Sequence, residues 1–315
     1  MVDYPTATDT LKQAKRPSAL TTERKRAGYT MLLPALIIVC GITLFPIVYS
    51  IWMSLNHVTM TTNGYRMQFA GLANYNKMVH AGEFWHSVWF TFYYSVVTVF
   101  IELTLGLLIA LAIDNVKRLK NVSIVIMLIP WALITVIAAE MWDYIDDATY
   151  GVLNAVLQAM HLIPQPYAWL SNATTAVIAM MVADIWKTTP FVVVIILAGL
   201  QMISNEYLEA AYIDGANSWQ VFWKVTFPLL RGSIALAALF RILQAFGVFD
   251  LPFVLTSGGP GTATQSLAIL ADQVLFQELH IGVGSAVTVA TVLIVLAISL
   301  VFVSVFRSLV VESEA

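Results

Sequence analysis

Charged residues and cysteine are scarce in this chain. Only 11% of the 315 residues are charged and Cys40 is the single cysteine, whereas soluble domains carry about 25% charged residues. One cysteine cannot form a disulfide within the chain or a cysteine metal site. The formal net charge of -3 is small and dispersed, and it indicates no nucleic-acid partner. These scarcities exclude an ordinary soluble domain and a disulfide scaffold.

The chemistry of catalysis and nucleotide binding is also missing. The glycine-rich run at 257–262 has no following Gly-Lys-Ser/Thr, which a phosphate-binding loop requires. The five histidines do not have the spacing of metal ligands, and no nucleophile elbow is present. The sequence therefore predicts a chain that is not an enzyme, has no catalytic residues and binds neither ATP nor a metal itself.

Long apolar runs dominate instead, because 59% of the residues are hydrophobic. Crossing about 30 Å of hydrocarbon takes about 20 apolar residues in a helix. Alternation with a period of two, typical of a barrel, is absent. We therefore expect an all-α integral membrane protein with six transmembrane helices. Their expected ranges are 31–53, 88–113, 122–142, 173–200, 234–255 and 283–306.

The basic residues predict the orientation of these spans. Lysine and arginine are enriched in the segments that meet the cytoplasm. Here they gather before the first run, at 117–120, at 224–231 and at 307, while Arg66 and Lys77 alone lie on the other side. We expect both termini to be cytoplasmic. The first run is longer than the core of a signal peptide, so we expect an uncleaved anchor.

This topology divides the chain into three parts. We expect a cytoplasmic tail at 1–28, a permease domain at 29–306 that contains a loop at 201–231, and a cytoplasmic tail at 307–315. The outer loops are expected at 56–87 and 143–172, the second with an amphipathic helix that begins near Tyr150.

Polar residues inside the expected spans are functional candidates, because charge in a bilayer is costly. Glu102 and Glu140 are lone carboxylates, each of which either touches substrate or has a structural role. Asp184 and Lys187 share one helical stripe, where they can partly neutralise one another, next to Pro190. Two helical stripes carry polar residues. The fourth span has Asp184, Lys187, Thr188 and Phe191 on one stripe, and the fifth has Arg241 and Gln244.

The charged segment 209–229 lies between two apolar runs and must face water or a partner. Gly215 predicts a turn, because glycine tolerates the left-handed backbone that ends a helix. Ser218 is the expected cap of a second short helix, and Pro228 its expected end. We therefore expect a helix-turn-helix loop between the fourth and fifth spans.

The order Glu-Ala-Ala, three residues, Gly-Ala and a hydrophobic stretch ending in proline resembles the EAA loop of permease subunits of binding-protein-dependent ABC importers. The run Trp186-Lys187-x-x-Pro190-Phe191 is similar to a pattern of the maltose/trehalose-type sugar permeases in that family. The resemblance implies that the loop is a coupling helix that docks on an ATPase subunit. The implied coupling residues are Glu209, Ala210, Ala211, Asp214, Gly215, Ala216, Phe222 and Pro228. The implied substrate path is Asp184, Lys187, Thr188, Phe191, Arg241 and Gln244.

The resemblance also implies the function and the partners. The chain would be the permease subunit of an ATP-driven importer that brings a sugar, such as trehalose or maltose, across a bacterial or archaeal cell membrane. It would pair with a second permease, two ATPase subunits that bind ATP and magnesium, and an extracytoplasmic sugar-binding protein. The alternative is a secondary transporter driven by an ion gradient, with Glu102, Glu140, Asp184 and Asp250 as an ion relay.

Overall fold

The computed structural model describes residues 19–61, 64–116 and 118–311. The chain separates into two compact units, one up to Trp52 and one from Met53 onward. The first unit consists of most of helix α2 (Ala19–Ser54), which contains Pro34 and Pro46. Large apolar side chains such as Ile37 and Phe45 are exposed on it, as expected of a helix that contacts lipid. The part of the expected tail at 1–28 that the structure describes, from Ala19 on, is helical, and residues 1–18 lie outside the described residues.

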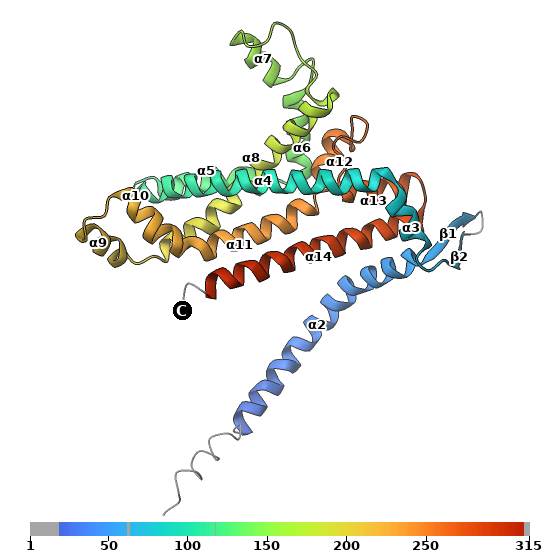
Figure 1. Ribbon diagram of the computed structural model, residues 1–315, viewed down its shortest axis with the longest axis horizontal. Coiled ribbons are helices and arrows are strands. Elements are labelled where there is room, and N and C mark those ends of the chain that lie inside the picture. Colours follow the sequence, from blue (N-terminus) through green and yellow to red (C-terminus); the bar gives the residue numbers. More distant parts are fainter. Residues whose placement is uncertain (1–18, 62–63, 117, 312–315) are drawn as a thin grey trace, which may run out of the picture. The chain divides into compact units, whose positions relative to one another are not determined.

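Long helices make up most of the second unit (Figure 1). They are α4 (Gly82–Asn115), α8 (Ala173–Gln201), α11 (Phe227–Phe246) and α14 (Ile281–Val311). Shorter elements join them: α3 (Ala73–His80), α7 (Val152–Ala159), η1 (Trp169–Ser171), α9 (Asn205–Ile213), α12 (Asp250–Thr256), α13 (Leu267–Asp272) and η3 (Gln273–Gln277). In the described part of the chain, five helices are long and apolar enough to cross a membrane, or up to six if one bent pair counts as a span.

That bent pair occupies the place of the expected third span. Helices α5 (Lys120–Ala132) and α6 (Thr135–Asp146) meet at an angle of 89°. Leu133 and Ile134 between them have extended backbones, with ψ of 139° and 136°. The span expected at 122–142 is therefore bent within its length. Leu133 and Ile134, as ordinary apolar residues, carry no sequence signal for the break.

The expected bounds of the fifth span, 234–255, were wrong. The helix begins at α10 (Ser218–Val221), passes through one π-helical turn, η2 (Phe222–Thr226), and continues as α11. It ends at Gly247, so α12 is a separate helix rather than the end of the span. Pro228 does not end the helix that begins at Ser218. It lies in the first turn of α11, where the missing N–H of proline is tolerated.

Two strands of a β-hairpin lie within the loop expected at 56–87. Strands β1 (Asn56–Thr61) and β2 (Gly64–Phe69) are antiparallel, with Asn56 opposite Phe69. The buried side chain of Asn74, on α3, donates to the carbonyl oxygens of Ser54 and Asn56 at the base of the hairpin, at 2.8 and 2.9 Å. These bonds hold α3 against the base of the hairpin.

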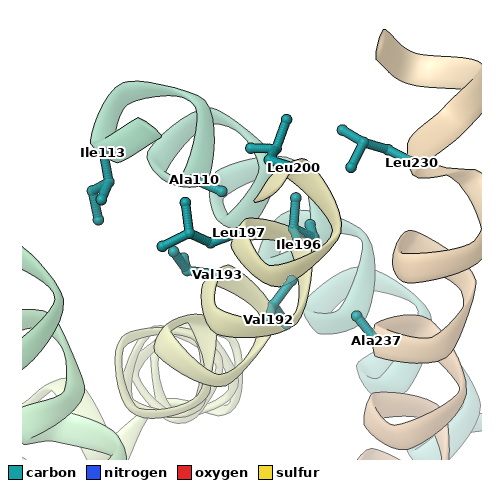
Figure 2. Packing of buried hydrophobic residues seen from close by; sticks show 9 residues of the cluster. All are labelled: Ala110, Ile113, Val192, Val193, Ile196, Leu197, Leu200, Leu230 and Ala237. Atoms are coloured by element: carbon teal, nitrogen blue, oxygen red, sulfur yellow. The ribbon is translucent and has the colours of Figure 1, made fainter. Parts of the chain in front are cut away.

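A tight apolar cluster joins α4, α8 and α11 (Figure 2). Val192, Ile196 and Leu200 of α8 lie between Ala110 of α4 and Leu230 of α11. Small residues let the helices approach closely, as in other membrane bundles. The cluster fixes the positions of these three helices, which also carry most of the buried charge.

Gly106 of α4 tests this close packing. A Cβ atom at this position would lie 2.5 Å from Cγ1 of Val192, so α4 and α8 would have to separate. We expect Gly106→Ala to destabilise the protein by about 1–3 kcal/mol, the usual cost of overpacking, measured by thermal unfolding in detergent. The matched control is Gly232→Ala in α11, where a Cβ meets nothing within 4 Å. Equal melting temperatures for the two variants would contradict the packing argument.

Candidate functional site

An ion pair between two buried side chains lies at the centre of the helix bundle. Arg241 of α11 is 2% exposed and Glu102 of α4 is fully buried. The guanidinium Nε donates to Glu102 Oε2, and Nη2 donates to Oε1 at 2.8 Å. Such two-pronged pairing is the strongest geometry available between arginine and a carboxylate. It compensates for much of the cost of removing both charges from water.

Asp184 of α8 joins the same network. Its Oδ2 accepts from Nη2 of Arg241 at 3.2 Å and from the hydroxyl of Tyr94 at 3.0 Å. The close ion-pair partner of Asp184 is Arg241 on another helix. Lys187, the partner expected within the same helix, interacts with Asp184 only at longer range. Arg241 outcompetes the neighbour on the same helix because its planar fork reaches two carboxylates at once.

Two uncharged polar side chains complete this network. The hydroxyl of Thr188 lies 2.7 Å from Glu102 Oε1 and 2.6 Å from the carbonyl oxygen of Asp184. Nη1 of Arg241 donates to Oε1 of Gln244 at 2.9 Å. Helices α4, α8 and α11 are thus tied together at one depth. We call these six residues the ion-pair network: Tyr94, Glu102, Asp184, Thr188, Arg241 and Gln244.

A cavity of about 440 Å³ adjoins the ion-pair network. Five residues of the predicted substrate path line it: Asp184, Lys187, Thr188, Arg241 and Gln244. Phe191 does not line it. Its ring stacks on Trp131, with centroids 5.9 Å apart and planes at 21°, and meets the Phe240 ring edge-on.

Sequence reasoning missed two polar or aromatic residues of the cavity wall, Trp131 and Thr135. Trp131 and Thr135 line the cavity from the two sides of the break between α5 and α6. Pro130 was the only local hint of irregular structure there. Phe249 and Asp250 line it next to the break after Gly247. Glu140 is exposed on α6 and is not part of the wall.

The loop between α8 and α11 forms two short helices. Ser204 caps α9, and Gly215 turns the chain with φ of +82°, a conformation that favours glycine. Asn217, rather than the expected Ser218, caps α10 through a capping box with Gln220. This asparagine signal was overlooked because serine is an equally good cap.

The predicted coupling residues differ in exposure. Those on α9 and in the turn are mostly exposed: Glu209, Ala210, Asp214 and Gly215. The other four are partly buried: Ala211, Ala216, Phe222 and Pro228. Large apolar side chains also face outward here, with Ile213 85% and Trp219 71% exposed. The loop therefore presents an apolar surface with acidic residues in it.

The segment around α7 is organised by Asn154. Its side chain bonds the backbone of Tyr167 in both directions and accepts from the indole of Trp169 at 3.0 Å. Before it, Asp147 accepts from the backbone N–H groups of Tyr150 and Thr149, which lowers the pKa of this carboxyl. These local bonds hold a long segment that has little helix of its own.

The ion-pair network predicts the effect of removing its cation. Arg241→Gln leaves Glu102 and Asp184 buried with no positive partner, and we expect destabilisation of about 3–5 kcal/mol. Thermal unfolding of the purified protein measures it. Arg231→Gln, an exposed arginine on the same helix, is the control. The double variant Glu102→Gln/Arg241→Gln should recover part of the loss, and an Arg241→Gln protein as stable as Arg231→Gln would refute the pairing.

Comparisons with known proteins agree with this architecture. Residues 102–310 match the family described as "Binding-protein-dependent transport system inner membrane component". The trehalose/maltose transport system permease protein MalF of Thermococcus litoralis is 38% identical, over 92% of this chain and 97% of its own length. The trehalose transport system permease protein SugA of Mycobacterium tuberculosis is 33% identical, over 90% and 89%.

A solved structure shares the fold. It is the crystal structure of a bacterial ABC transporter involved in the import of the acidic polysaccharide alginate, with a TM-score of 0.79 over 91% of this chain and 96% of the matched chain. At 20% identity this similarity concerns the fold alone. The chain therefore belongs to the family of binding-protein-dependent inner-membrane components, the pore-forming permease subunits of ABC importers.

Proposed function

We propose that this permease forms part of the path by which an uncharged sugar, a disaccharide such as trehalose or maltose, enters the cytoplasm. The observation that carries the proposal is the cavity beside the ion-pair network. Its volume of about 440 Å³ lies within the range of about 300–1,000 Å³ that is typical of small-molecule sites. The names of the two sequence relatives point to the same class of sugar.

The cavity wall has the chemistry that a sugar requires. Lys187 and Gln244 offer donors, and Asp184 and Asp250 offer acceptors, for the hydroxyl groups. Trp131 and Phe249 offer flat apolar surfaces for the C–H face of a sugar ring. On this proposal Phe191 acts indirectly, by supporting the Trp131 ring.

The proposed topology has six spans, with α5 and α6 together forming the third. The termini and the loop at 201–231 lie in the cytoplasm, as the distribution of lysine and arginine predicts. The permease domain is 29–306, and the segments 1–28 and 307–315 are the flanking cytoplasmic parts. Lipid covers the apolar outer faces of the helices.

The remaining parts of the importer are separate proteins. A second, similar permease completes the path, an extracytoplasmic binding protein delivers the sugar, and two ATPase subunits bind ATP and magnesium. The loop containing α9 and α10 docks on one ATPase through Glu209, Ala210, Ala211, Asp214, Gly215, Ala216, Phe222 and Pro228. Its exposed apolar side chains support this role, because such a surface is costly in water.

Chain continuity provides the mechanical link. Helix α8 ends at Gln201, four residues before the start of α9, and α10 continues without a break through η2 into α11. Helices α8 and α11 carry Asp184 and Arg241. Movement of the loop is therefore passed to both sides of the cavity wall, and nucleotide binding can shift the population between two states of the path.

An ion-driven secondary transporter is the rival explanation for the intramembrane charges. It leaves the loop between α8 and α11 without a role, and it does not fit membership of a binding-protein-dependent family. Two members of the ion relay that it requires, Glu102 and Asp184, already form ion pairs with Arg241. We therefore favour the importer.

Reconstitution tests the proposed function. The complete importer, in liposomes that contain ATP, should accumulate radiolabelled trehalose or maltose only when the binding protein is present. A panel of sugars, assayed by stimulation of ATPase activity, identifies the substrate. Uptake driven by a pH or sodium gradient without the ATPase subunits would refute the importer.

Glu209 tests the coupling role of the loop. Glu209→Lys should abolish ATP-dependent uptake while membrane insertion is unchanged, because a reversed charge on the exposed face of α9 disrupts docking. Uptake in liposomes and recovery of the ATPase subunits with the permease measure the effect. Glu206→Lys, an exposed glutamate on the same helix, is the control. Normal transport by Glu209→Lys would exclude this residue from coupling.

A further inference from the structure

Glu102 controls the charge of the cavity from outside it. The side chain is fully buried on α4 and is not part of the cavity wall. It accepts two bonds from Arg241 and one from Thr188, both of which do line the wall. Arg241 would otherwise attract anions into the cavity. Glu102, which lies outside the cavity, neutralises its charge.

Four of the five N–H donors of Arg241 are also occupied. Nε is used by Glu102, Nη2 by Glu102 and Asp184, and Nη1 by Gln244. A guanidinium held at all three nitrogens cannot rotate to form a two-pronged pair with a carboxylate or sulfonate of a substrate without breaking bonds inside the bundle. Lys187 is then the only cationic group of the described wall with no ion-pair partner.

The balance of formal charge depends on the same residue. The cavity wall contains Asp184, Asp250, Lys187 and Arg241, two acidic and two basic groups. Glu102 behind the wall adds a third carboxylate and leaves one net negative charge. At low dielectric constant such a charge acts over several ångströms.

We propose that Glu102 is a specificity-determining residue that makes the cavity reject anionic solutes and accept uncharged ones. This inference rests on the proposed function, in which the cavity holds the sugar. It assigns the selection against charged sugars to a positioning residue that does not touch the substrate. Removing the carboxylate would leave Arg241 and Lys187 balanced only by Asp184 and Asp250.

The experiment measures the charge of the cavity directly with small thiol reagents. Cys40→Ser removes the natural cysteine, and Thr135→Cys places one thiol in the cavity wall. The complete importer in nanodiscs is treated with an anionic reagent, sulfonatoethyl methanethiosulfonate, or a cationic one, trimethylammonioethyl methanethiosulfonate. The ratio of the two labelling rates, normalised to a free thiol, reports the local potential and does not depend on transport or on the binding protein.

We expect Glu102→Gln to raise the ratio of anionic to cationic labelling by at least about threefold. Glu102→Asp, which keeps the charge, should leave the ratio near that of the parent. Glu83→Gln makes the same chemical change on the exposed first turn of α4 and should have no effect.

Other outcomes overturn the proposal. An unchanged ratio in Glu102→Gln would mean that Glu102 carries no charge or does not influence the cavity. An equal rise in Glu83→Gln would mean that the effect is not local. If Glu102→Gln does not assemble, Glu102→Gln/Arg241→Gln removes both buried charges and should keep the parental ratio, and a changed ratio would refute the charge balance. A negative result here leaves ATP-driven sugar uptake, tested separately, unaffected.

Discussion

The buried pairing of Arg241 with Glu102 and Asp184 constrains the whole bundle. A guanidinium stays charged in a protein, so a buried arginine must be surrounded by acceptors. Those acceptors come from α4 and α8, while the arginine lies on α11. Each helix is therefore fixed in rotation and in depth by one charged side chain. Apolar packing alone would allow sliding, since lipid and leucine are equally apolar.

The apolar cluster lies on one side of this network. Ala110 follows Glu102 by two turns on α4, Val192 follows Asp184 by two turns on α8, and Ala237 precedes Arg241 by one turn on α11. On α8 and α11 these steps lead toward the ends that join the loop at 201–231. An apolar layer thus separates the charged network from that loop. The loop is connected to the cavity through helix backbones rather than through polar side chains.

Local sequence signals predicted much of this fold. Apolar length identified the long helices, and spacings of three and four residues placed Asp184 with Thr188 and Arg241 with Gln244 on common stripes. Gly215 was recognised as a turn because its left-handed backbone requires that residue type. The helix breaks were not predictable in the same way. Leu133 and Ile134 resemble any other apolar residues of a span, and their extended backbones depend on tertiary contacts.

The choice of partner for Asp184 shows where sequence reasoning ends. Lys187 is three residues away and is the natural partner within one helix, whereas Arg241 is 57 residues away. Which cation is selected depends on how α8 and α11 are rotated against one another, and the sequence of neither helix contains that information. Lysine can extend a flexible stem along the cavity wall and place its ammonium in the polar part of the cavity. Arginine, with its fixed fork, gains more from two buried carboxylates. Burial therefore assigns Arg241 to the structural network and leaves Lys187 facing the cavity.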